Sequence, residues 1–152
     1  MTAINLKLWQ RFEVTVHGVT HSGGSTTTAS TISVGSDNIV DKTVLIDASA
    51  EKVLDIADFD SGTFTFIWLE NEHASQTVDV QITVSAGIGD DYIVFTIPAG
   101  QRLVFPDGTA PLKGTIDLLN GTAAKEIGEI WALASGVNTP LRVVATTTDA
   151  GA

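Results

Sequence analysis

The chain has 152 residues, of which 43% are hydrophobic and 17% charged, and its formal net charge at pH 7 is −10. A domain of this length buries roughly 68–70% of its unfolded surface, so the composition predicts one folded domain. Eight basic residues against 18 acidic ones disfavour nucleic-acid binding, and the lack of cysteine excludes disulfides and thiolate metal sites.

The N-terminal segment is predicted to be a strand-like arm followed by a flexible linker. In the stretch RFEVTVHGVTH, the apolar residues Phe12, Val14 and Val16 alternate with polar ones, which is typical of a β-strand. Residues 22–33, SGGSTTTASTIS, are small and polar, as in a linker or loop. We therefore predict an arm and linker over residues 1–33 and a β-sandwich domain over residues 34–152.

The body of the chain is predicted to consist of short antiparallel strands. In QTVDVQITVSA, aliphatic residues from Val78 to Val84 alternate with polar ones, which indicates one buried and one solvated face. In TFTFIWLEN, the alternation places Phe64, Phe66 and Trp68 on the face that we expect to be core, and Trp131 is expected in the core as well.

Two segments could also form short helices. EKVLDIAD contains helix-favouring residues, but its length favours a strand, and Gly128 weakens a helix in AAKEIGEIW. Regular short strands with frequent turn signals predict an all-β fold. The predicted fold class is an antiparallel β-sandwich, jelly-roll-like, with an extended N-terminal arm.

The stretch FTIPAGQRLVFPDG is predicted to be a hairpin. Pro98 lacks the N–H that a strand ladder uses, so it should end the first strand, and Gly100 permits the turn. The apolar side chains of Leu103 and Phe105, on the second strand, should then pack against the core. The hairpin's charges, Arg102 and Asp107, lie at its ends, where they are solvated or meet a neighbouring molecule. With Trp9 and Phe12 of the arm, they are the candidate partner-contact residues.

The sequence carries no recognisable catalytic or metal-binding motif. On a strand, His17 and His21 would lie about 13 Å apart, too far to share one metal ion. His73 follows two glutamates but lacks a second ligand pair at a recognisable spacing, and the acidic residues 55–60 and 90–91 do not match a calcium loop. We therefore predict no catalytic residue, no metal and no cofactor, and expect that the protein is not an enzyme.

Three segments together resemble a known class of protein. GTFTFIWLENEHASQTVDVQI is similar to a strand–Asn–turn–strand unit, YIVFTIPAGQRLVFP to a hairpin around Pro-Ala-Gly, and EIWALASGVNTPLRVVA to a closing strand with its partner. In this order they resemble small β-sandwich virion proteins of tailed bacteriophages, a class that includes head decoration (cement) proteins. The resemblance covers about Gly62 to Ala145. It implies a structural role in a capsid or tail and oligomerisation, and it carries over no active-site residue.

The expected function is that of a capsid decoration protein that binds the outer capsid surface and stabilises the shell. Its partners would be the major capsid protein and further copies of itself, for example as a trimer, and the arm would add to a sheet edge of a neighbour. The negative charge suits the outside of a shell packed with DNA. We expect assembly in the host cytoplasm and location in the virion, with neither nucleic acid nor membrane as a partner.

The alternative is a carbohydrate-binding or adhesion β-sandwich module of a phage tail or fibre. Trp9, Tyr92 or acidic turns holding calcium would make its glycan contacts. The sequence leaves a location in the head and one in the tail both open.

Overall fold

The computed structural model describes residues 4–34, 39–59, 64–84, 91–105, 113–114 and 125–147, and these are built almost entirely of antiparallel strands. Two strands form an N-terminal hairpin, which we call the arm: β1 (Ile4–Val16) and β2 (Val19–Val34). The other strands form the body: β3 (Ile39–Ile46), β4 (Glu51–Asp55), β5 (Phe64–Asn71), β6 (Val78–Val84), β7 (Asp91–Ile97), β8 (Arg102–Val104), β9 (Lys113–Gly114), β10 (Lys125–Ala134) and β11 (Thr139–Thr147).

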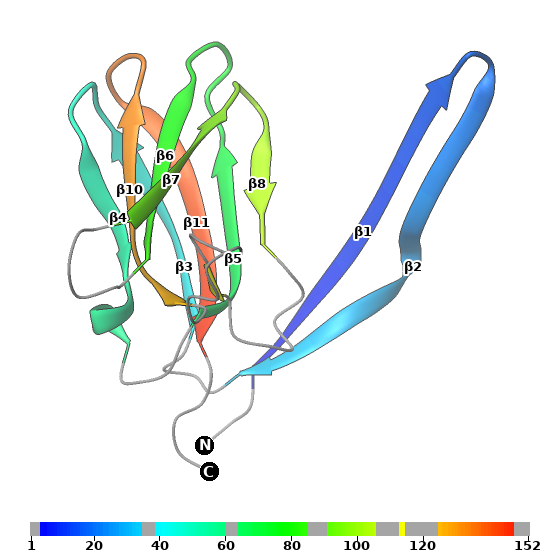
Figure 1. The fold of residues 1–152 in the computed structure, drawn as a ribbon, viewed down its shortest axis with the longest axis horizontal. Coiled ribbons are helices and arrows are strands. Elements are labelled where there is room, and N and C mark those ends of the chain that lie inside the picture. The colour runs from blue at the N-terminus through cyan, green and yellow to red at the C-terminus, as the bar shows by residue number, and fades with distance from the viewer. Residues whose placement is uncertain are drawn as a thin grey trace.

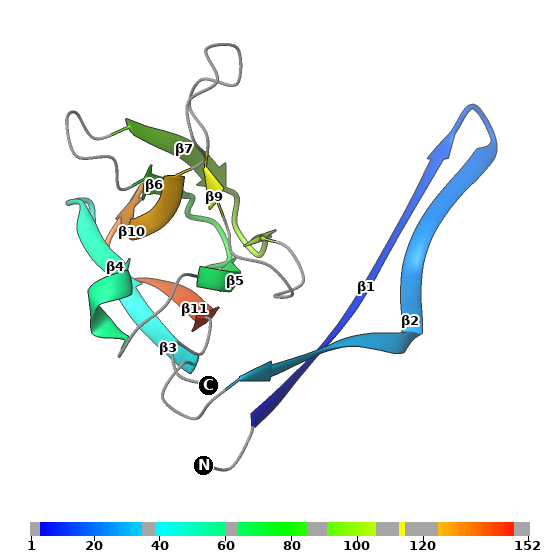
Figure 2. The same cartoon turned by 60° about the horizontal axis from the view of Figure 1, so that its bottom comes forward.

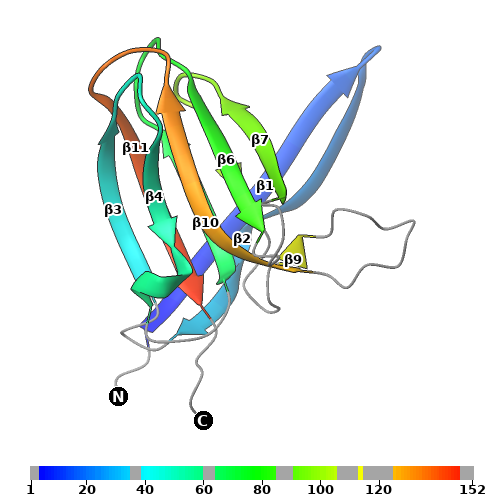
Figure 3. The ribbon, with the colours of Figure 1, turned by 60° about the vertical axis from the view of Figure 1, so that its left-hand side comes forward.

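The body is a sandwich of two antiparallel sheets (Figures 1 and 3). One sheet has the strand order β3-β11-β5-β8 and the other the order β4-β10-β6-β7, with β9 paired to the start of β10. Apart from β9, eight strands therefore make two four-stranded sheets, and the chain crosses between them at most of its turns. This is the strand order of a jelly roll. The predicted fold class, an all-β antiparallel sandwich, is confirmed.

The core lies between the two sheets and is supplied by alternate residues of their inner faces. Val78, Val80 and Ile82 of β6 are buried, as the alternation predicted, while Asp79 between them is exposed. Period-two patterning places all aliphatic residues of such a strand on one side, so burying that side drives the sheets together. The predicted return of Leu103 and Phe105 to the core is also confirmed, because both pack against it.

The prediction for the aromatic face of β5 is confirmed in part: Phe64 and Phe66 are buried, but the three aromatic rings do not share one face. Phe64 packs in the main core together with Ile67, but Phe66 packs in a second, smaller cluster with Trp68 on the other face of the sheet. The cause is an irregularity in the pairing with β11 between Phe64 and Phe66, where one residue is bulged. A one-residue bulge reverses the side to which later side chains point.

The segment predicted as a flexible linker is a strand. Residues 22–33 lie within β2, which pairs antiparallel with β1 from Ile4↔Val34 to Val16↔Val19, with one irregularity between Leu8 and Gln10. Its small and β-branched residues suit a strand once a partner is present. His17 and Gly18 form the turn between β1 and β2, with φ of 51° and 80°. The prediction that His17 lies on a strand was therefore wrong. The arm projects away from the body (Figure 2).

The two helix candidates are strands. EKVLDIAD begins as β4 and ends in a short 3-10 turn, η1 (Ile56–Asp58), and the described residues of AAKEIGEIW, 125–131, form the first part of β10. The hairpin predicted around Pro98 was wrong, because β7 pairs with β6 in one sheet and β8 pairs with β5 in the other. The predicted strand end and turn are present, since β7 ends at Ile97 and Gly100 has a φ of +66°, but the turn leads the chain from one sheet to the other.

Candidate functional site

The arm presents apolar side chains to solvent. The side chains of Trp9, Val14 and Val19 are exposed by 52%, 49% and 57%. Phe12, the other predicted contact of the arm, lies on β1 opposite Gly23 of β2. The arm residues thus come from one two-stranded ribbon, and they form the first candidate contact surface.

Arg102, the predicted contact of the body, is exposed at the start of β8. Its guanidinium carbon lies 5.0 Å from the ring centroid of Trp68, an arrangement that favours cation–π attraction. The indole N–H of Trp68 donates a hydrogen bond of 3.2 Å to Glu70. Trp68 is therefore half-buried with a polar partner, not a core residue as predicted. Asp107 lies outside the described residues.

A cleft of about 490 Å³ lies on the outer face of the β4-β10-β6 sheet. We call it the Trp131 cleft, and its lining residues are Asp55, Ile56, Gln81, Thr83, Gly128, Glu129 and Trp131. Its size falls in the range of small-molecule sites, about 300–1,000 Å³. Trp131 is half-buried here and not in the core, which corrects the second tryptophan prediction.

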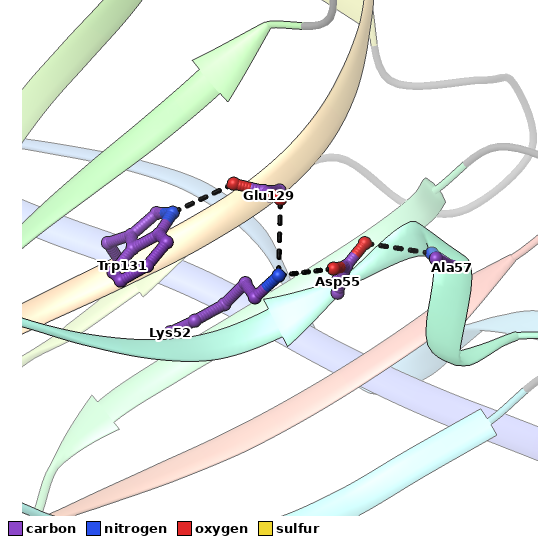
Figure 4. A network of polar contacts seen from close by, with 5 residues as sticks. All are labelled: Lys52, Asp55, Ala57, Glu129 and Trp131. Atoms are coloured by element: carbon purple, nitrogen blue, oxygen red, sulfur yellow. Dashed lines mark hydrogen bonds and ion pairs between the residues drawn. The ribbon is translucent and has the colours of Figure 1, made fainter.

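Lys52 organises one side of this cleft (Figure 4). Its ammonium group contacts Asp55 at 2.6 Å and Glu129 at 3.2 Å, and it lies 5.8 Å from the ring centroid of Trp131. The indole N–H of Trp131 donates to Glu129 at 2.9 Å. The register explains the arrangement, because Trp131 of β10 is directly opposite Lys52 of β4.

Asp55 is held as a carboxylate. The hydrogen bond from Lys52 and a second from the backbone N–H of Ala57 lower the pKa of Asp55 below its usual value of 3.8. An acid with a lowered pKa is a poor proton donor near neutral pH, so Asp55 is unsuited to general-acid catalysis. An aromatic ring beside fixed carboxylates and the side chains of Gln81 and Thr83 is suited to binding a polar ring compound.

Of the three histidines, two are exposed on the arm and one forms hydrogen bonds within a turn of the body. His17 and His21 are both exposed, one in the turn of the arm and one on β2. The Nδ1 atom of His73 accepts hydrogen bonds from the backbone N–H groups of Ser75 and Gln76 at 3.1 and 2.9 Å. His73 therefore has the turn role that the sequence favoured.

Neither a metal cluster nor a membrane-spanning helix occurs in the described part of the chain. The described residues contain no group of three or more histidines and acidic residues that could hold a metal ion. Among them there is also no helix of the length and hydropathy needed to cross a membrane.

Comparison with known proteins does not assign this chain to a family. No protein-family model matches it, and no curated protein matches it. The function is therefore argued from the fold and from the surfaces described above.

Sequence reasoning missed the second exposed surface of the body. Four consecutive residues of β7, Tyr92 to Phe95, have side chains that are 36–60% exposed. A signal was present, since the run DYIVFTI carries no charge after Asp91 and has apolar residues on both faces. The Trp131 cleft could not have been found in this way, because its residues come from three strands far apart in the sequence.

Proposed function

We propose that the protein is a structural component of an assembled particle, of the kind that the resemblance to phage decoration proteins implies. The carrying observation is the arm, a two-stranded ribbon that extends from a β-sandwich and exposes Trp9, Val14 and Val19. An isolated two-stranded hairpin is marginally stable in water. A contact with a neighbouring subunit would bury its apolar side chains and stabilise it.

The jelly-roll body supports the same function without deciding it. This architecture occurs in viral capsid proteins and in lectins, and a fold alone does not determine function. As proposed, the body binds the outer surface of a phage shell and the arm reaches a neighbouring subunit by strand addition. The net charge of −10 favours the outer surface over the DNA-filled interior. That the chain is not an enzyme stays a prediction.

The direct test uses purified protein and phage shells that lack it. We expect the protein to co-sediment with the shells and to raise the temperature at which they rupture. Changing two exposed arm residues to acids, Val14→Asp with Val19→Asp, should weaken both effects, because the arm no longer joins neighbouring subunits on the shell. The exposed body substitution Val137→Asp is a matched control and should preserve them. Shells that bind no protein, or that bind it without gaining heat resistance, would contradict the proposed function.

A second candidate function is glycan binding at the Trp131 cleft. The observation that favours it is the indole of Trp131 beside Glu129, Gln81 and Thr83 in a cleft of about 490 Å³. Sugars are bound by aromatic rings together with hydrogen-bonding groups, and this cleft offers both. In such a role the protein would be an adhesion module of a tail or fibre.

Glycan-array binding tests the second candidate. Wild-type protein should bind a defined set of glycans, and Trp131→Ala should lose that binding, while Trp9→Ala keeps it because Trp9 lies on the arm. Binding that survives Trp131→Ala, or a wild-type protein that binds no glycan, would exclude the cleft as a sugar site.

A further inference from the structure

The four edges of the body's sheets differ in how they are protected against pairing with another chain. Edge strand β3 carries Asp41 and Lys42, β4 carries three charged residues, and β8 has only three residues and begins with Arg102. Charges, prolines and short length keep free sheet edges from pairing. β7 has none of these from Tyr92 to Ile97. In the described part of the chain it pairs with β6 alone, and it is the unprotected edge.

Both faces of β7 are incompletely covered. On the inner face Ile97 is buried in the core and Phe95 packs edge-to-face on Phe105, with ring centroids 6.3 Å apart. Ile93 shares this face by alternation but is 46% exposed, so the apolar interior is partly open along this edge. On the outer face, Thr96 donates a hydrogen bond of 2.6 Å to Asp79 of β6. The edge thus offers an apolar inner side and an outer side of Tyr92, Val94 and Thr96, next to Asp79 of β6.

The arm matches this edge in its pattern of residues. In β1, the even-numbered positions from Phe12 to Val16 are apolar, whereas the odd-numbered positions include Arg11, Glu13 and Thr15. A strand with one apolar and one polar face can extend such a sheet, because its apolar side chains continue the apolar inner face and its polar side chains face solvent.

The distribution of charge favours the arm as the occupant of this edge. Residues 4–34 have a net charge of +1, because they contain Lys7, Arg11 and Glu13 as their charged residues. The net charge of the whole chain is −10, so the remaining residues together carry a net charge of −11. Pairing β7 with β7 of another copy would bring two acidic bodies together, including Asp79 and Asp91 of each. Pairing β7 with the arm brings a segment of net charge +1, in which Arg11 also pairs with Glu13 at 2.6 Å, to a body of net charge −11.

We propose that the β7 edge of one copy receives the arm of a second copy, with β1 added as a further strand of the sheet. The apolar positions of β1 then continue the face of Ile93 and Phe95, and Arg11 lies on the side of Asp79. The acceptor is a second copy because the arm points away from its own body (Figures 1 and 2). This inference rests on the proposed function, in which the arm makes assembly contacts, and it names the acceptor of the arm.

The first test is the mass of the full-length protein in solution, measured by light scattering coupled to size exclusion. Wild-type protein should be an oligomer. Val94→Lys, which places a charge on the exposed outer face of β7, should shift it to the monomer mass. Leu45→Lys, at an exposed position of the protected edge strand β3, should leave the oligomer unchanged. Circular dichroism establishes that each variant is folded. A monomeric wild-type protein, or a Val94→Lys oligomer like wild type, would overturn the inference.

The second test places single thiols in a chain that has no cysteine. Thr15→Cys protein is mixed with a size-tagged Tyr92→Cys protein and treated with a bismaleimide, whose spacer tolerates small differences in register. The expected product joins the arm of one copy to β7 of the other. A parallel mixture with Leu45→Cys should give no such product. Predominant joining of Tyr92→Cys to itself would show β7–β7 pairing and would overturn the inference, as would the absence of the mixed product.

These outcomes are separate from those that test the proposed function. A monomeric protein that still binds and stabilises phage shells overturns the arm-to-β7 contact alone. An oligomer joined through the arm and β7 that binds no shell overturns the proposed function alone.

Discussion

Asn71 is fully buried and uses every polar atom of its side chain. Its amide nitrogen donates to the carbonyl oxygens of Gln76 and Ile97 at 2.7 and 3.1 Å, and its amide oxygen accepts from the N–H of His73 at 3.0 Å. One side chain therefore joins the end of β5, the following turn and the end of β7. Buried polar groups of this kind stabilise a fold only while all partners are present.

Asn71→Ala should lower the free energy of unfolding by about 3 kcal/mol, because it leaves buried backbone groups without partners. Chemical denaturation measures the change. The neighbouring substitution Glu72→Gln, at an exposed position, should have little effect. Equal stability of Asn71→Ala and wild type would show that the turn does not depend on these hydrogen bonds.

Asp55 should make the protein sensitive to acid. Its pKa is lowered by Lys52 and by the N–H of Ala57, so the stability it contributes is present above its unfolded pKa, near 3.8. That stability is lost as the pH falls through the lower folded pKa. Asp55→Asn keeps the bond to Ala57 and removes the ion pair, so its Tm should fall less than that of wild type below about pH 5.

The same part of the pH dependence should become smaller in Lys52→Met, because the larger of the two causes that lower the pKa of Asp55 is gone while the hydrogen bond from the N–H of Ala57 remains. Thermal melts over a pH series give both curves. An Asp55→Asn variant that loses stability in acid as steeply as wild type would show that the ion pair does not cause the effect.

Among the strands and turns, those with regular alternation could be predicted from the sequence, and those that depend on a partner could not. The run around Val80 and the strand end and turn at Pro98 follow local rules of burial and backbone geometry, whereas the placement of β7 and β8 in different sheets does not. Residues 22–33 did not, because small polar residues form a strand only when β1 is paired beside them. The bulge that turned Trp68 outward is likewise a property of the pairing with β11.

The turn between β7 and β8 depends on the left-handed backbone of Gly100, which has a φ of +66°. A methyl group there meets no atom within 4 Å, so the cost of Gly100→Ala is conformational and not steric. We expect a loss of about 1–2 kcal/mol, measured by chemical denaturation. Gln101→Ala, in the same turn with its side chain exposed, should be close to wild type. A neutral Gly100→Ala would contradict the left-handed conformation.

For the whole molecule, the sandwich class could be predicted from strand spacing, whereas the Trp131 cleft could not, and the uncharged run of β7 indicated an exposed surface without showing that β7 is an edge strand. The Trp131 cleft gathers residues of β4, β6 and β10, which only the folded topology brings together. The open edge at β7 depends on which strand ends each sheet, and that order is not encoded in any one segment. Predicting a contact surface therefore requires the order of the strands in the sheets, even when each strand has been predicted correctly.

We propose one molecule in two parts, a jelly-roll body that binds a shell and an arm that binds a neighbouring copy. Its most direct test is an electron-microscopy map of phage shells incubated with the protein. We predict added density on the outer shell surface that fits the sandwich, with the arm lying along β7 of an adjacent copy. Shells without added density, under conditions where the protein is folded and in excess, would contradict the account.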